Sequence, residues 1–321
     1  MSKPRIIFMG TPEFAVPSLE ILVQHPYQVI GVVTQPDRPK GRGKQLAPPP
    51  VKMFAEQYHL TVLQPERAKD QEFMDAFRKL APDLVAVAAF GQLLPKGILD
   101  LPPLGCINVH PSLLPKYRGA APLNWTIIQG ETGTGVTIMR MDEGMDSGDI
   151  LVQEETPVGP DETVGELHDR LAKMGAELLL KTIQMIEDGT VRRTRQDQAA
   201  VTFAPRLKKE DGIIHWHRGV DDIIRLVRGL SPSPCAFTFL QGKTLKIFLA
   251  AGRKLPVDQV PGRISEVTQE GLPVAAGDGL VFLREVQLEG KKRMPVQDFL
   301  RGYPLRPGER LGKSDADRDH F

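Results

Sequence analysis

One segment of the sequence, Asn108-Val-His110-Pro-Ser-Leu-Leu-Pro115, brings together side chains that can stabilise charge and move protons. Asn108 and His110 stand two residues apart at the end of an apolar run. If that run is a strand, both side chains point to the same face, because side chains alternate along a strand. An amide that donates hydrogen bonds and an imidazole that can gain a proton suit the stabilisation of an oxyanion.

A second segment supplies the acids. Gly135–Met139 has the composition of a strand, and a glycine-rich stretch with Asp142, Asp146 and Asp149 follows it. A carboxylate beside the imidazole would orient the ring and carry a proton. An Asn, a His and an Asp at strand ends therefore suit the transfer of a carbonyl group. Residues of these types are also common in structural roles, so their types alone leave both interpretations open.

The elements around these segments indicate an α/β fold. Four continuous apolar runs have the length of strands that are buried on both faces of a parallel sheet. They are Arg5–Met9, Val29–Val33, Asp83–Phe90 and Cys106–His110. Helical patterns follow at Val51–Leu60, Gln71–Leu80 and Thr163–Asp188. We therefore predict a Rossmann-like, mostly parallel sheet, with ligand sites beyond the carboxyl ends of its strands.

A change of pattern along the chain indicates two domains. We predict a catalytic domain over residues 1–189, a basic linker over 190–209, a C-terminal domain over 210–313 and a polar tail over 314–321. The C-terminal domain has a helical pattern at Val220–Leu230 and then short period-two stretches, which are typical of a small barrel or sandwich. These stretches are Ala236–Leu240, Thr244–Ala250, Gly262–Val267 and Gly279–Val286. We expect an OB-like β-barrel.

Composition and motifs exclude several classes of protein. Hydrophobic residues make up 41% and charged residues 25% of the 321, and 41 basic residues offset 40 acidic ones, as in an ordinary globular protein. No apolar run approaches the roughly 18–20 residues of a membrane helix. Cys106 and Cys235 are too few for a disulfide framework. We expect a cytoplasmic protein without a membrane partner.

Cofactor motifs are not evident either. Gly10 follows the first apolar run, but no G-x-G-x-x-G does, so a nicotinamide cofactor is not expected. His215 and His217 would share one face of a strand, yet no third metal ligand is apparent. We therefore expect no metal and interpret these two histidines as structural.

Several stretches resemble the folate-dependent formyltransferases. The signature of that family is similar to Asn108–Pro115 with Asp146 downstream. Further stretches resemble the branch that acts on methionyl-tRNA, and the resemblance covers nearly the whole chain. They are Phe8–Phe14, Thr34–Lys44, Ser112–Pro122 and Gly135–Met139. Pro111 stands where many bacterial members have Gly, and in this it is similar to the branch that acts on glycinamide ribonucleotide.

The resemblance implies an activity and a site. The catalytic residues would be Asn108, His110 and Asp146, and the reaction would move a formyl group from 10-formyltetrahydrofolate to the free amino group of methionyl initiator tRNA. The folate would lie against two loops. One loop holds Phe90, Gly91, Gln92, Leu93 and Leu94, and the other holds Ser112, Leu113, Leu114 and Pro115.

The resemblance also implies a tRNA-binding loop, whose basic residues are Arg38, Lys40, Arg42 and Lys44. Arg42 is the residue we single out, because a guanidinium can contact phosphate and base together. The basic linker and further cations would continue a positive path along the phosphates. These cations are Lys243, Lys246, Arg253, Lys254, Lys291, Lys292 and Arg293.

Two alternatives remain open at the level of sequence. One is a formyltransferase that acts on a small amine, such as glycinamide ribonucleotide or an amino sugar nucleotide, which needs neither the basic loop nor the second domain. The other is a noncatalytic RNA-binding module, which leaves the Asn, His and Asp set without a purpose. The sequence does not show the oligomeric state, and we take a monomer as the expectation.

Overall fold

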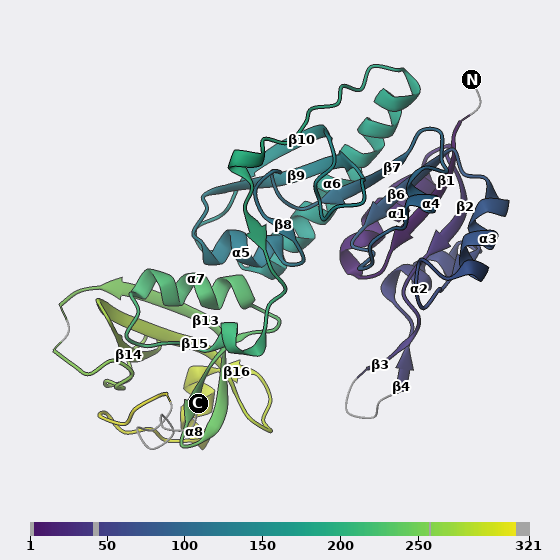
Figure 1. Ribbon diagram of the computed structural model, residues 1–321. Coiled ribbons are helices and arrows are strands. Elements are labelled where there is room, and N and C mark those ends of the chain that lie inside the picture. The colour runs from purple at the N-terminus through teal and green to yellow at the C-terminus, as the bar shows by residue number, and fades with distance from the viewer. Residues whose placement is uncertain (1–2, 41–44, 257, 313–321) are drawn as a thin grey trace. The chain divides into compact units, whose positions relative to one another are not determined.

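The computed structural model describes residues 3–40, 45–256 and 258–312, apart from the side chain of Lys40 (Figure 1). The chain forms two compact units. Unit 1 comprises residues 1–122, 133–157 and 168–205, and unit 2 comprises residues 123–132, 158–167 and 206–321. Each unit is described by itself.

The centre of unit 1 is a seven-stranded sheet in the order β10-β9-β7-β6-β1-β2-β5. Its strands are β1 (Arg5–Gly10), β2 (Gln28–Val33), β5 (Val62–Leu63), β6 (Leu84–Ala88), β7 (Cys106–His110), β9 (Gly133–Arg140) and β10 (Ile150–Pro157). The strands from β7 to β5 pair in parallel, whereas β9 is antiparallel to both β7 and β10. The predicted α/β fold with a mostly parallel sheet is therefore confirmed.

Helices lie between the strands along the chain of unit 1. They are η1 (Glu13–Ala15), α1 (Val16–Gln24), α2 (Pro50–Gln57), α3 (Gln71–Leu80), α4 (Lys96–Leu99) and most of α6 (Val164–Glu187). Helix α5 (Pro122–Ile128), except Pro122, and residues 164–167 of α6 belong to unit 2. Phe73 and Phe77 of α3 belong to the same buried cluster as Ile7 of β1 and Val85 of β6. Such packing removes apolar surface from water, which stabilises the fold. Because the strands are buried, their sequences are uninterrupted runs of apolar residues.

Helix α6 packs closely on the other face of the sheet. A Cβ atom added at Gly175 would lie 2.7 Å from Cγ1 of Val109 on β7 and 3.5 Å from Cγ1 of Val136 on β9. Side chains alternate along β7, so Asn108 and His110 point to the face opposite Val109 and away from α6. The close approach of α6 thus fixes which face of β7 carries the polar residues.

This contact gives a first testable prediction. Alanine is the better helix former by about 0.8–1 kcal/mol, but overpacking a core typically costs about 1–3 kcal/mol, so Gly175→Ala should lower the Tm. Thermal denaturation followed by circular dichroism measures the change. Gly302→Ala is the matched control, because a Cβ there has no described neighbour within 4 Å, and its Tm should not fall. An unchanged Tm for Gly175→Ala would show that the helix moves away freely.

Two short ribbons complete unit 1. Strand β3 (Arg38–Lys40) pairs with β4 (Gln45–Ala47) in an antiparallel hairpin. Strand β8 (Arg118–Gly119) pairs in parallel with β11 (Phe203–Ala204). Residues 190–205, which we interpret as part of a linker, therefore lie within unit 1 and pair with its chain. This pairing gives the segment a defined place beside the loop that follows β7.

Unit 2 contains a β-sheet in the order β12-β13-β15-β14, with all neighbours antiparallel and β16 paired to β15. Its elements are α7 (Val220–Leu230), β12 (Ala236–Leu240), β13 (Lys243–Lys254), β14 (Leu272–Ala276), β15 (Gly279–Leu288), β16 (Met294–Pro295) and α8 (Val296–Gly302), with η3 (Lys209–Gly212) before them. The short helix η2 (Gln198–Ala200) belongs to unit 1. The β-rich character of the C-terminal part is confirmed. The OB-like topology stays a prediction.

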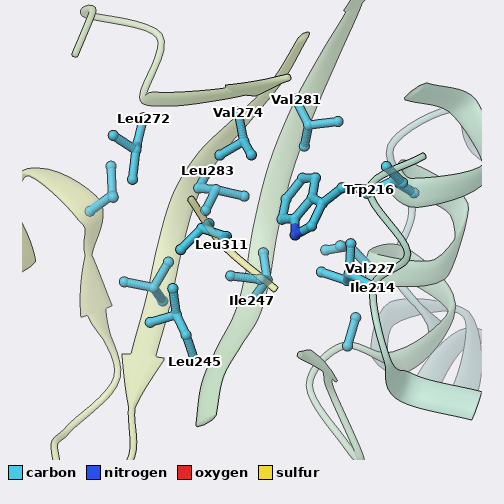
Figure 2. Packing of buried hydrophobic residues seen from close by; sticks show 14 of the residues in the cluster. Ile214, Trp216, Val227, Leu245, Ile247, Leu272, Val274, Val281, Leu283 and Leu311 are labelled. Carbon is cyan, nitrogen blue, oxygen red and sulfur yellow. The ribbon is translucent and has the colours of Figure 1, made fainter. Parts of the chain in front are cut away.

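The core of unit 2 lies between α7 and the sheet (Figure 2). Val227 of α7 packs with Ile247 of β13 and Val281 of β15 around Trp216, whose indole Nε1 donates a hydrogen bond of 3.0 Å to Thr238 Oγ1. The indole thus buries its apolar body and satisfies its one donor.

One expectation for unit 2 is wrong. Gly262–Val267 does not form a strand, because only Arg263 and Ile264 make isolated bridges, to Arg310 and Val274. Strand β14 instead supplies the partner of β15.

None of the helices in the described ranges combines the length and the apolar content that a membrane crossing requires.

Candidate active site

Strand β7 carries the polar residues that the sequence singles out. Asn108 and His110 pair with Met139 and Thr137 of β9, and their side chains are 9% and 4% exposed. His110 ends the strand at the carboxyl edge of the sheet, where open α/β sheets bind ligands. The amide and the imidazole are thus held by a central strand of a rigid sheet.

The protonation of His110 is constrained by its neighbours. Its Nε2 lies 3.0 Å from the main-chain oxygen of Tyr117, and a carbonyl can only accept a hydrogen bond, so Nε2 carries a hydrogen. Its Nδ1 lies 3.7 Å from Oδ2 of Asp146. Nδ1 is therefore the ring nitrogen that faces the Asp146 carboxylate.

Asp146 lies in the loop between β9 and β10 and has a positive φ of 51°. Its Oδ2 accepts a hydrogen bond of 2.9 Å from the main-chain N–H of Gly119, which follows the loop after β7. This left-handed conformation is uncommon for residues other than glycine, although Asp adopts it more readily than most. The structure thus brings Asp146, which is distant in sequence, to within reach of His110.

Cys106 shares the face of β7 with Asn108 and His110. Burial is the main cause that raises the pKa of its thiol to about 12. Only the thiolate is a strong nucleophile, so this cysteine is inert near neutral pH. Cys106 therefore adds no nucleophile to the face of β7 that carries Asn108 and His110.

The first predicted folate loop follows β6. Phe90 and Leu94 are buried, whereas Leu93 is 71% exposed. Gln92 ties this loop to the preceding segment, because its Oε1 accepts a hydrogen bond of 2.8 Å from Ala68 N and its Nε2 donates one of 3.1 Å to Glu66 O. A pocket of about 300 Å³ lies against the loop. Its lining residues are Arg67, Ala68, Lys69, Gln92, Leu93, Leu94 and Pro95.

The second predicted folate loop is fixed by a buried hydroxyl. Thr137 Oγ1 donates a hydrogen bond of 2.7 Å to Ser112 O and accepts one of 3.1 Å from Leu114 N. Gln153 Nε2 adds hydrogen bonds to Leu114 O and to Thr137 Oγ1. None of Ser112, Leu113, Leu114 or Pro115 lines the pocket beside the first loop. Hydrogen bonds thus fix both loops, and the pocket of about 300 Å³ lies beside the first.

The predicted tRNA loop is described in part. Arg38 forms an exposed ion pair of 3.0 Å with Glu66. Arg42, Lys44 and the side chain of Lys40 lie outside the described residues. Beside Arg38, hydrogen bonds from Gln64 and then from Lys52 lower the pKa of Asp37, so its carboxylate stays charged and anchors the start of the β3–β4 hairpin.

The predicted basic path in unit 2 is partly neutralised. Arg253, Lys254 and Arg293 each form an ion pair of 2.6 Å with a carboxylate. These carboxylates belong to Glu270, Asp221 and Glu285. Exposed ion pairs contribute little, about 0–1 kcal/mol, so a phosphate can compete for such cations.

The two histidines of the His215-Trp-His217 segment lie with their ring centroids 5.6 Å apart. Burial, followed by the neighbouring His217 and Arg218, lowers the pKa of His215. Within the described ranges no three His, Cys, Asp or Glu side chains come together as a possible metal site.

Three neighbours of the site have no sequence signal of their own. Tyr117 and Gly119 act through main-chain groups, and Gln196 stands in a polar, basic stretch. The one available clue is that Tyr117 and Gly119 belong to the glycine-containing stretch just after His110.

A mostly parallel α/β sheet with an amide, an imidazole and a carboxylate near its carboxyl edge suits an enzyme that transfers a carbonyl group. Comparison with models of known protein families shows which family the chain belongs to. Residues 4–183 match the model described as formyl transferase, and residues 206–304 match the model of the formyl transferase C-terminal domain. The chain belongs to the formyl transferase family.

Named relatives are similar over their full length. The chain is 59% identical over 312 residues to the methionyl-tRNA formyltransferase of Syntrophus aciditrophicus. The aligned region covers 97% of this chain and 100% of the relative. It is 53% identical over 318 residues to that of Geotalea uraniireducens, with coverages of 98% and 100%.

Solved structures share the fold at low identity. HypX from Aquifex aeolicus in complex with tetrahydrofolic acid has a TM-score of 0.64 at 17% identity, over 98% of this chain and 51% of HypX. The sugar 3N-formyl transferase WlaRD, solved with dTDP and 5-N-formyl-THF, also has a TM-score of 0.64, at 18% identity, over 91% of this chain and 100% of WlaRD.

Proposed function

We propose that the chain transfers the formyl group of 10-formyltetrahydrofolate to the free amino group of methionyl initiator tRNA, giving N-formylmethionyl-tRNA. The full-length similarity to methionyl-tRNA formyltransferases carries this proposal. The facing His110 and Asp146 supply the chemistry that such a transfer needs. We assign this reaction to the cytoplasm, where tRNA is charged.

The proposed roles follow from the chemistry of each side chain and from the contacts of His110 and Asp146. When bound, 10-formyltetrahydrofolate supplies an electrophilic formyl carbon. Asn108 and protonated His110 would donate hydrogen bonds to the formyl oxygen as the amine attacks and the oxygen gains negative charge. Asp146 would accept the proton that the amine loses and pass it to the departing folate nitrogen, directly or through water. Tyr117 O keeps Nε2 protonated, so Nδ1 is the donor that faces the reaction.

The folate would lie along the two loops at the carboxyl edge. The pocket of about 300 Å³ is at the lower end of small-ligand sites, which span roughly 300–1,000 Å³. Leu93 offers an apolar side chain that is 71% exposed, and Gln92 fixes the loop that carries it. We assign the folate to Phe90–Leu94 and Ser112–Pro115, whose main-chain groups suit the polar edge of a pterin and whose side chains suit its faces.

A formyl-transfer assay tests this function. The protein is mixed with 10-formyltetrahydrofolate and, in separate reactions, with methionyl-tRNA, uncharged tRNA, glycinamide ribonucleotide or an amino sugar nucleotide. We expect only methionyl-tRNA to be formylated, because only it offers both the amine and the RNA stem. Formylation of a small amine with methionyl-tRNA untouched would contradict the proposed acceptor, and transfer to none of them would contradict the enzyme.

The tRNA would be gripped by the basic loop and by the second domain. We assign Arg38, Lys40, Arg42 and Lys44 to the acceptor stem. We assign residues 210–313, as an OB-like domain joined through residues 190–209, to the phosphate backbone. We take the protein to act as a monomer. Arg38 forms an exposed ion pair with Glu66, so it can exchange that carboxylate for a phosphate at small cost.

Arg42→Ala should lower kcat/KM for methionyl-tRNA roughly tenfold, with folate affinity unchanged. One base contact is worth about 1–3 kcal/mol, and the lower end of that range corresponds to such a loss. Steady-state kinetics at several salt concentrations measures this effect, because phosphate contacts weaken with salt. Arg78→Ala on the exposed face of α3 is the matched control. A wild-type kcat/KM for Arg42→Ala at moderate salt would remove Arg42 from the interface.

A further inference from the structure

The stretch of polar and basic residues before β11 makes specific contacts with the loop that carries Asp146 and with the start of β10. Thr194 exchanges two main-chain hydrogen bonds with Ile150, of 2.8 and 2.9 Å. Two residues later, Gln196 is only 6% exposed, although its neighbours in sequence lie on the surface. A buried amide in an otherwise exposed segment must find partners for its donors and acceptor.

The amide of Gln196 uses its full hydrogen-bonding capacity. Its Oε1 accepts hydrogen bonds from Nε and Nη2 of Arg118, at 2.9 and 2.7 Å. Its Nε2 donates to the main-chain oxygens of Asp146 and Gly148, at 2.8 and 2.7 Å. An arginine can only donate and a carbonyl can only accept, so the partners themselves fix which end of the amide is oxygen.

These contacts fall on the residues that set the direction of the Asp146 carboxylate. Asp146 holds a left-handed φ of 51°, and Gln196 binds the carbonyl of that same residue. Gly119, which binds the Asp146 carboxylate, is the next residue after Arg118, which binds Gln196. Strand β8 therefore reaches Asp146 twice, through its main chain and through Gln196.

We infer that Gln196 is a positioning residue, which holds the Asp146 loop so that the Asp146 carboxylate faces His110. Arg118, itself only 6% exposed, fixes the amide, and its charge polarises the amide so that the two N–H groups bind the loop carbonyls more strongly. This inference rests on the role of Asp146 that we propose above. It gives residues 190–205 a function in the chemistry of unit 1 besides that of a connection.

Gln196→Glu isolates this role. The glutamate keeps an oxygen for Arg118, but it has no N–H for the two loop carbonyls and turns an oxygen toward them. We expect kcat to fall roughly 10–10²-fold, the loss that a misplacement of about 1 Å can cause, while KM for folate and for methionyl-tRNA stays near wild type. Gln57→Glu, the same change at an exposed residue of α2, should keep the wild-type kcat.

A double-mutant cycle separates positioning from general stability. If Gln196 acts through Asp146, then adding Gln196→Glu to Asp146→Asn should change kcat by no more than about twofold, because the group being positioned has lost its charge. Thermal denaturation confirms that all variants are folded at the assay temperature. An equal loss in both backgrounds, a raised KM with normal kcat, or an unchanged kcat for Gln196→Glu would overturn the inference.

The same cycle distinguishes two failures. If Asp146→Asn lowers kcat and Gln196→Glu does not, only the inference about Gln196 fails. If Asp146→Asn itself leaves kcat unchanged, the proposed role of Asp146 fails, and the inference fails with it.

Discussion

Replacing His110 with alanine should lower kcat for formyl transfer by about 10²–10⁴-fold, which corresponds to roughly 3–5 kcal/mol of activation free energy. His110 is 4% exposed, and its Nδ1 faces the Asp146 carboxylate. Alanine removes the cation that would stabilise the formyl oxygen. The affinity for tRNA should stay near wild type, because a residue buried at the end of β7 offers little surface to an RNA.

A second substitution keeps the contacts of His110 and removes only its proton chemistry. Glutamine can still donate a hydrogen bond to Tyr117 O, but its amide does not titrate. We therefore expect His110→Gln to fold better than His110→Ala and to lose a similar part of kcat. His25→Ala is the matched control, since His25 also contacts a main-chain carbonyl, that of Ile21, at 2.8 Å.

Steady-state kcat and a separate tRNA-binding measurement decide the case for His110. Loss of kcat with intact tRNA binding supports its role at the reacting carbon. A parallel loss of both quantities, or a His110→Gln variant with wild-type kcat, would show that His110 supports the fold or the RNA interface instead.

Patterns that depend on local sequence predicted much of the fold. The α3 and α7 helices span the predicted ranges, Gln71–Leu80 and Val220–Leu230. In α7 the buried residues Val220, Ile223 and Val227 follow helical spacing, and such a pattern is visible without knowing what it packs on. Strand β7 also spans its predicted range, which placed Asn108 and His110 on one face.

Contacts between distant segments were beyond prediction from patterns. The run Gly262–Val267 alternates like a strand, yet its main chain makes only isolated bridges, while Leu272–Ala276 pairs along β15. Strand pairing depends on which partner is within reach, and no single segment records that. The same reason hid Gln196, because a glutamine among arginines looks like a surface residue until Arg118 is seen beside it.

The candidate site also contains residues that the sequence predicted and residues that it did not. The residue types and the spacing of Asn108 and His110 suggested the chemistry, and the resemblance to a family supplied Asp146. The conformation of Asp146 depends on Gly119, 27 residues earlier, and on Gln196, 50 residues later. Reactive groups can thus be recognised in a sequence, whereas the groups that aim them emerge from the fold.

Asp146→Asn should lower kcat by about 10²–10⁴-fold, the usual value of general acid–base catalysis. Asparagine has nearly the same shape, and its Oδ1 can still accept the hydrogen bond from Gly119 N, so the loop should keep its conformation. The amide carries no charge to face Nδ1 of His110 at 3.7 Å and cannot take a proton from the attacking amine. The loss should therefore appear in kcat, with both KM values near wild type.

Asp142→Asn provides the matched control in the same loop. Asp142 accepts hydrogen bonds from Gly144 N and Ser147 Oγ at the surface, so its replacement makes the same change of charge without touching His110. A wild-type kcat for Asp146→Asn, or an equal loss for Asp142→Asn, would contradict the assignment. Combining Asp146→Asn with His110→Gln should cost far less than the product of the two single losses, because residues that act as one unit lose their function together.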